Sequence, residues 1–205
     1  NYNKDYFFNF ITLVSNLKTL NKTILKDKVS KVASEILQEP REALLFSNIS
    51  FLVNLPKNKR VLYNWHNATN GYIKRNRCVN FWMPVLVNKN SKNGSLEISE
   101  ASHKISNYPF LEYKTKFASN NLTQNQIPEE LFKKNKQRKI ALKVGSILGM
   151  HNNIIHRSTL NRSSECSYTC VFKVWSISKD WTLSSNLGQK YFTGDTAAGP
   201  DIKII

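Results

Sequence analysis

The sequence predicts a single globular domain that is mainly β structure, with helices at its N-terminal end. Apolar residues recur at helical spacing before Pro40 and in short, alternating runs after it. The 205 residues include 40% hydrophobic residues but seven glycines and six prolines, a composition typical of a folded protein. A chain of this length forms one core more readily than two, so we expect one domain over residues 1–205.

Residues 1–45 are expected to be mainly helical. Four apolar residues between Asn21 and Pro40 share one face of a helix, because their steps of four, three and four follow its period. They are Leu25, Val29, Val32 and Ile36. Pro40 in "QEP" ends this helix, because proline has no amide hydrogen to donate.

Strands are expected over 46–103 and 141–180, which form the core of the β structure. In the first block, short apolar runs are broken by "NLPKNKR" and "NATNGY", as is typical of strands and turns. In "CSYTCVFKVWSIS" (166–178), residues alternate between two faces, as in a sheet strand. One face carries Tyr168, Cys170, Phe172 and Val174, and the other carries Thr169, Val171, Lys173 and Trp175.

Between the two blocks of strands lies a long polar insert, residues 104–140. A loop of this length inside a compact domain is more often functional or mobile than structural. We therefore expect the insert to act as a lid over a site.

The charge of the chain restricts its partners to a broad class. Thirty Lys and Arg residues against 14 Asp and Glu residues give a net charge of +16, whose field attracts anions. The basic run "FKKNKQRK" (132–139) is able to contact phosphates, but neither interleaved aromatics nor zinc-ligand spacing accompanies it. We expect a small, anionic substrate and no nucleic acid partner.

Cysteine spacing and hydropathy indicate the compartment. Cys166 and Cys170 lie about 13 Å apart on an extended strand, beyond the reach of a disulfide. An odd count of three cysteines and this spacing favour a reducing environment, so we expect a cytoplasmic protein. No apolar run approaches the roughly 20 residues that a transmembrane helix needs.

Four histidines are candidates for chemistry: His66, His103, His151 and His156. Any one of them alone is more often a buried core residue than a ligand. His151 and His156 are five positions apart, so in one regular strand they point to opposite faces and do not ligate the same metal.

Two stretches together resemble the phytanoyl-CoA dioxygenase family of non-haem iron, 2-oxoglutarate-dependent oxygenases. They are "NLPKNKRVLYNWHNATNGYIKRNRCVNFWMPVLVNKNSKNGSLEISEASHK" and, after the insert, "VGSILGMHNNIIHRSTLNRSS". The Trp-His pair, the "FWMP" strand, the "NGSLEI...SH" turn and the "HRS..N.S" segment follow in the family's order, and the resemblance spans residues 54 to about 175. It implies a double-stranded β-helix, a cupin-like jelly roll of two antiparallel sheets, which holds Fe(II) with two histidines and one carboxylate.

Carried over residue by residue, the resemblance places the metal ligands at His66 and His156, with Fe(II) and 2-oxoglutarate as cofactors. The family's metal carboxylate falls on Ala68, which cannot ligate. The arginine that anchors 2-oxoglutarate falls on Ser167, which cannot form the bidentate pair that arginine forms with a carboxylate. Lys173, on the same strand face as Ser167, is the first expected substitute anchor and Arg162 the second, and Asn80 is also assigned to cofactor binding.

Three interpretations of Ala68 remain open. In the first interpretation, the chain is a halogenase-like enzyme in which chloride occupies the position beside Ala68. In the second, it has kept the fold but is inactive, and it serves as a binding module or as a partner of an active relative. In the third interpretation, a neutral oxygen of Asn67, Thr69 or Asn70 completes the site. Because both histidines are retained, we expect iron-dependent hydroxylation or halogenation of a small substrate, to which basic residues at the mouth are suited: Lys74, Arg75 and Arg77.

Overall fold

The structure, a computed structural model, describes residues 4–17, 27–47, 49–59, 62–68, 78–105, 111–114 and 123–176. Its helices are α1 (Lys4–Ser15), α3 (Asp27–Leu37) and the short 3-10 helices η1 (Arg41–Ala43), η2 (Ser102–Lys104) and η3 (Glu129–Leu131). Its strands are β1 (Leu44–Phe46), β2 (Ser50–Asn54), β3 (Cys78–Val85), β4 (Leu96–Ser99), β5 (Leu111–Lys114), β6 (Thr123–Gln126), β7 (Gln137–Lys139), β8 (Leu148–His151), β9 (His156–Ser158) and β10 (Ser167–Ser176).

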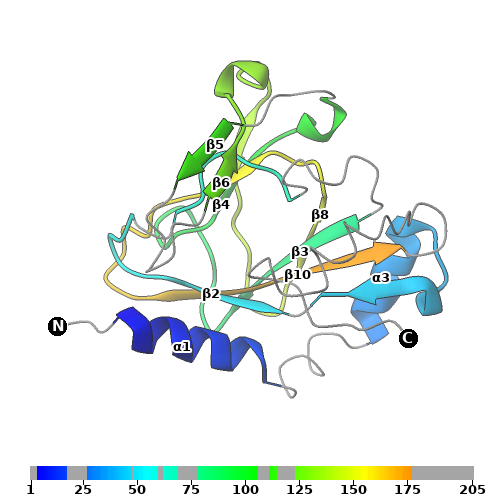
Figure 1. Ribbon diagram of the computed structural model, residues 1–205, viewed down its shortest axis with the longest axis horizontal. Helices are drawn as coiled ribbons and strands as arrows, with labels where there is room; N and C mark the ends of the chain where they lie inside the picture. Colours follow the sequence, from blue (N-terminus) through cyan, green and yellow to red (C-terminus); the bar gives the residue numbers. More distant parts are fainter. Residues whose placement is uncertain are drawn as a thin grey trace.

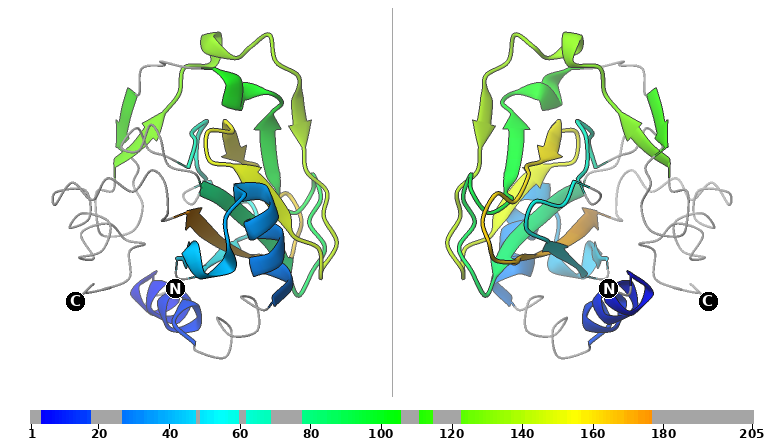
Figure 2. Two further views of the ribbon diagram at one scale, coloured as in Figure 1. Left: turned by 90° about the vertical axis from the view of Figure 1, so that its right-hand side faces the viewer. Right: turned by 90° about the vertical axis from the view of Figure 1, so that its left-hand side faces the viewer.

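The described strands form antiparallel sheets, as the resemblance implies. The larger sheet has the order β1-β10-β3-β8, and β2 pairs with the first half of β10 while β1 pairs with its last residues. The smaller sheet has the order β7-β4-β9, and β5 pairs with β6 (Figure 1). α1 and α3 lie beside the larger sheet, away from the β5–β6 pair (Figure 1 and Figure 2). A mainly β fold with helices outside the sheets is therefore confirmed.

β10 shows how the sequence pattern builds the two layers. Cys170, Phe172 and Val174 are buried against the helices, in one cluster with α3. Val171, on the opposite face, packs with a second cluster that joins the larger sheet to the smaller one. The alternation predicted for this strand is confirmed, and Lys173 points to the same side as Val171.

α3 presents a different face from the predicted one. Ala33 and Leu37 are buried in the core, with Val29 packed against them, whereas Val32 and Ile36 are 41% and 54% exposed. Residues 29, 33 and 37 also recur at steps of four, so two apolar stripes overlap on this helix. Alanine at position 33 lets the backbone approach the sheet closely, which favours the observed stripe. Position 25, which belonged to the predicted stripe, lies outside the described residues.

The range 104–140 contributes to the sheets and to the core. β7 pairs with β4 and becomes an edge strand of the smaller sheet. Ile127 and Phe132 are 0% and 2% exposed, and they pack with Trp65 and Ile155 in a third cluster. The second half of the expected insert thus packs behind the segments that carry His66 and His156.

Two further observations concern the environment of the chain. Cys78, Cys166 and Cys170 are free thiols. No helix within the described ranges is long and apolar enough to cross a membrane.

Candidate functional site

His66 and His156 lie side by side at the centre of the candidate site. His66 lies between β2 and β3 in the chain and pairs with the first residue of β9 through a single antiparallel bridge. Each backbone N–H donates to the other residue's carbonyl oxygen, at 2.9 and 2.8 Å. The ring centroids are 4.3 Å apart, with the ring planes inclined at 52°. The fold therefore brings together the two histidines that the resemblance paired.

Both imidazoles are held in the same tautomer. Nδ1 of His66 contacts the carbonyl oxygen of Asn64 at 2.7 Å, and Nδ1 of His156 contacts that of Ile154 at 2.8 Å. A carbonyl oxygen only accepts hydrogen bonds, so each Nδ1 carries the proton and each Nε2 keeps its lone pair. Metal-binding histidines are oriented in this way by a backbone carbonyl.

The histidine pair is uncharged at neutral pH. Burial, followed by the charge of the neighbouring His156, lowers the pKa of His66 to about 3. Burial lowers the pKa of His156 to about 4, and the charge of Lys173 contributes to the shift of both rings. The site therefore offers two neutral nitrogen acceptors.

Lys173 contacts the backbone of the residue that stands in place of the family's carboxylate. Its Nζ donates a hydrogen bond of 2.7 Å to the carbonyl oxygen of Ala68. Burial lowers the pKa of Lys173, and the thiol of Cys78 acts on it in the opposite sense. That thiol is neutral, because burial raises its pKa to about 12. The described part of the chain thus gives Lys173 no anionic partner.

Asn80 adds an unpaired polar atom beside this lysine. It lies directly opposite Lys173 in the β3–β10 pair, so the two side chains share one sheet face. Asn80 is 5% exposed, and within the described residues its Oδ1 has no hydrogen-bond partner. Since buried polar atoms are almost always hydrogen-bonded, this amide is suited to a bound polar ligand.

Ser167 lies apart from this group and contacts a different lysine. Its hydroxyl donates to the carbonyl oxygen of Asn93 and accepts a 2.7 Å hydrogen bond from Lys89 Nζ. Lys89 also donates to Asn54 Oδ1 at 2.7 Å and to Gly94 O at 3.0 Å. All three ammonium hydrogens are therefore used, and each acceptor is neutral.

Lys89 contacts Ser167, the residue to which the resemblance assigns the family's cosubstrate arginine. The residue is 1% exposed, and burial lowers its pKa to about 7. Sequence reasoning missed it, because "NKNSKNGS" is a polar run in which nothing marks one lysine as buried. Its hydrogen-bond partners come from three separate parts of the chain.

The described residues do not fit the complete iron site of the family. Two imidazole Nε2 atoms suit two ligand positions, but Ala68 offers a methyl group at the third. No group of three or more His, Cys, Asp or Glu side chains is placed to hold a metal in the ranges that the structure describes. Lys173 donates to the carbonyl of Ala68 itself, and a protonated amine so close repels a divalent cation.

The other predicted residues are separate from the site or outside the described ranges. His103 and His151 form a second ring pair, with centroids 5.3 Å apart. Asn67 is buried, at 1% exposed. The remaining candidates lie outside the described residues: Thr69, Asn70, Lys74, Arg75 and Arg77.

Comparison with known proteins identifies the family. The sequence matches the family described as phytanoyl-CoA dioxygenase (PhyH) over residues 9–167. No curated protein sequence matches it significantly.

Solved structures with this fold include three proteins of low sequence identity. EvdO2 from Micromonospora carbonacea var. aurantiaca, complexed with 2-oxoglutarate, gives a TM-score of 0.60 at 15% identity and covers 78% of this chain and 64% of its own. The non-heme alpha ketoglutarate dependent carbocyclase SnoK from nogalamycin biosynthesis gives a TM-score of 0.55 at 15% identity. The match covers 72% of this chain and 55% of SnoK. EvdMO1 gives a TM-score of 0.55 at 16% identity, and the match covers 75% of this chain and 32% of EvdMO1.

These likenesses establish the jelly-roll fold, and the chain spans 32% to 64% of the length of the three structures. The family match extends from α1 to the first residue of β10, well over half of the chain, and includes both histidines. The chain belongs to the phytanoyl-CoA dioxygenase (PhyH) family.

Proposed function

We propose that this chain is a ligand-binding member of the family that has lost the oxygenase chemistry, and that its site binds a small hydroxycarboxylate without iron. The observation that carries the proposal is the hydrogen bond of Lys173 Nζ to the carbonyl oxygen of Ala68, the residue to which the resemblance assigns the family's metal carboxylate. A buried cation without an anionic partner is unfavourable, so a bound carboxylate supplies the missing charge.

The donors and acceptors of the site specify the ligand class. Lys173 supplies charged N–H groups for a carboxylate oxygen. The Nε2 atoms of His66 and His156 accept hydrogen bonds, so they match a hydroxyl group of the ligand rather than the carboxylate oxygens that Lys173 binds. Asn80 Oδ1 also accepts. A small acid that carries at least one hydroxyl group satisfies both kinds of partner.

Calorimetric titration of the metal-free protein with malate and with succinate tests this proposal. The two acids have the same carboxylates, but succinate has no hydroxyl group for the imidazoles. We expect malate to bind at one to one and more tightly than succinate, because succinate leaves buried acceptors unpaired. Lys173→Met is expected to abolish malate binding, while Lys139→Met, the same change on exposed β7, leaves it unchanged.

A second candidate function is iron-dependent oxidation, by hydroxylation or halogenation. It is favoured by the imidazole pair, whose Nε2 lone pairs are oriented as in metal ligands. In this function His66 and His156 would hold Fe(II), and chloride beside Ala68 would supply the charge of the lost carboxylate. Lys173 then has to move away from the carbonyl oxygen of Ala68 or lose its own proton, because a cation there repels the metal.

Anaerobic titration with Fe(II) or Mn(II), with and without 2-oxoglutarate and chloride, separates the two candidates. Stoichiometric metal binding that strengthens with chloride and 2-oxoglutarate supports the oxidation and contradicts the metal-free site. Malate binding without metal, together with no metal binding, supports the ligand-binding function. If neither malate nor metal binds, both candidates are wrong.

A further inference from the structure

Trp65 and Arg157 form a second cross-strand pair, directly behind the histidine pair. Because the bridge pairs His66 with His156 in antiparallel register, the residues Trp65 and Arg157 are also opposite each other. Successive side chains of extended backbone point to opposite sides, so this outer pair lies on the far side of the backbone from the two imidazoles. The Arg157 guanidinium lies over the Trp65 ring, with Cζ 4.5 Å from the ring centroid.

The backbone alone holds the two histidine segments in register at a single point. The bridge is isolated, and the hydrogen bonds on either side of it do not continue the ladder. Ser158 N donates to the carbonyl of Tyr63, and Ala68 N donates to that of Asn152. These bonds tie the two segments together without the regular spacing of a ladder, so side-chain contacts also contribute to their relative orientation.

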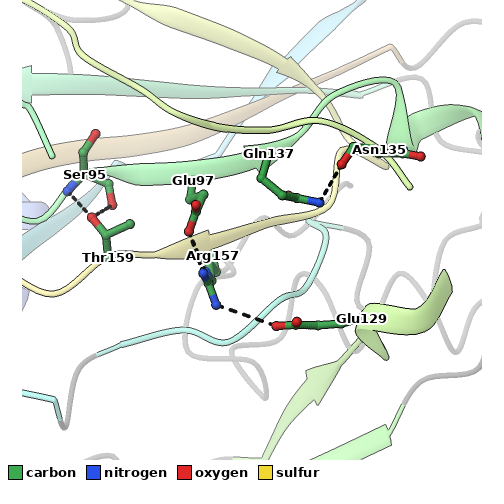
Figure 3. Close-up of polar contacts among 7 residues, drawn as sticks. All are labelled: Ser95, Glu97, Glu129, Asn135, Gln137, Arg157 and Thr159. Atoms are coloured by element: carbon green, nitrogen blue, oxygen red, sulfur yellow. Dashed lines mark hydrogen bonds and ion pairs between the residues drawn. The ribbon is translucent and has the colours of Figure 1, made fainter. Parts of the chain in front are cut away.

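Arg157 makes those contacts. Its Nε and one terminal nitrogen lie 2.8 and 2.7 Å from Oε2 of Glu97 on β4, and its other terminal nitrogen lies 3.7 Å from Oε1 of Glu129 on η3. Figure 3 shows the guanidinium between the two glutamates. The carboxylate of Glu97 is the less exposed of the two, at 11% against 61%, so it is the main anchor.

Trp65 is fixed in turn by the second half of the insert. It is 4% exposed and packs edge-on against Phe132, with ring centroids 5.1 Å apart. Its carbonyl oxygen accepts a 2.8 Å hydrogen bond from Ile127 N. The Arg157 guanidinium therefore links a rigid cluster on the His66 side to a buried carboxylate on the His156 side.

We propose that Arg157 is a positioning residue of the ligand site: by stacking on Trp65 and pairing with Glu97 it sets the relative orientation of the His66 and His156 imidazoles. It acts through the backbone of both segments and does not touch the ligand. The inference rests on the proposed function only where ligand affinity is concerned, because the orientation of the rings is a property of the free protein.

The test compares Arg157→Met and Arg157→Lys with a matched control. Methionine removes the charge and the planar group, whereas lysine keeps the charge and loses the stacking geometry. Arg138→Met is the control, since it breaks the Arg138–Glu100 ion pair of 3.2 Å in the same sheet without contacting either histidine segment. The primary measurement is the long-range proton–nitrogen NMR spectrum of nitrogen-labelled imidazoles in the free protein.

We expect both Arg157 variants to shift the ring signals of His66 and His156, methionine more than lysine, while those of His103 and His151 stay as in the wild type. Affinity for malate should fall about tenfold in Arg157→Met, the lower end of the range known for metal-binding histidines that lose an outer contact. Arg138→Met should leave all four histidines and the affinity unchanged.

Unchanged signals of the site histidines in both Arg157 variants would overturn the inference, as would an equal change in Arg138→Met. If Arg157→Met does not fold, the lysine variant decides alone. If wild-type protein binds no malate but the ring signals shift as expected, the proposed function is wrong and the positioning role stands.

Discussion

The buried amine of Lys89 makes the stability of the fold depend on pH in the alkaline range. Burial lowers its pKa from the ordinary 10.5 to about 7 in the folded chain. Between these values the unfolded chain binds more protons than the folded one, so stability rises with pH through this window. The contribution is fully present above pH 10.5 and is lost as the pH falls to about 7. Below pH 7 both states are protonated and the dependence ends.

The size of the effect follows from the pKa difference. Each pH unit within the window changes the free energy of unfolding by about 1.4 kcal/mol, and less near the folded pKa, where half of the amine is already neutral. Between pH 7 and pH 9 the contribution of Lys89 is therefore about 2 kcal/mol. Three hydrogen bonds to the ammonium oppose the shift, so this is an upper value.

Urea unfolding of wild type and Lys89→Met, measured in parallel at pH 6, 7, 8 and 9, isolates the contribution of Lys89 to the free energy of unfolding. Methionine keeps the length of the stem but has no proton to exchange, and the three oxygens it leaves without a donor give a constant cost. The stability of wild type minus that of the variant is expected to rise by about 2 kcal/mol from pH 7 to pH 9. Lys139→Met, the same change at an exposed position, is the control. A flat difference for Lys89→Met would refute the reasoning and mean that the ammonium stays charged.

Two further predictions concern the site and its support. Ala68→Asp restores the family's carboxylate next to Lys173, so we expect the new aspartate to form an ion pair with Lys173. This variant should bind neither Mn(II) nor malate in a calorimetric titration. Only the double variant with Lys173→Met should bind Mn(II). Phe132→Ala should destabilise the chain by about 3–5 kcal/mol in urea unfolding, since it empties the buried cluster behind the histidines. Leu131→Ala, at an exposed neighbour, should cost less than about 0.5 kcal/mol, and equal losses would contradict the packing.

The parts of the fold that were predictable are those in which a short stretch carries its own pattern. The alternation in β10 is confirmed, because a strand between two layers exposes both of its faces to apolar neighbours. In α3 the same kind of reasoning selected the wrong stripe. Its apolar residues fit two faces equally well, and the sheet beneath, which the local sequence does not contain, decides between them.

The candidate site was predictable only as far as the family resemblance reached. It placed His66 and His156 together, and their ring contact agrees with it. Lys89 and Arg157 carry no local signal, because most of their partners lie far away in the chain. Lys89 contacts Ser167 and Asn54, and Arg157 contacts Trp65 and Glu97. Lys173 was assigned from its strand face, but its contact with Ala68 depends on the tertiary fold.

The bridge between His66 and His156 also determines when the site forms during folding. It joins segments on either side of the 104–140 range, and closing so long a loop carries an entropic cost that one residue pair does not offset. β10, the last described strand, pairs with β1, β2 and β3, so the larger sheet is complete only after β10 joins it. The imidazoles therefore meet late. A nascent chain that ends before β9 holds one histidine of the pair and has no ligand site, however well its first strands have folded.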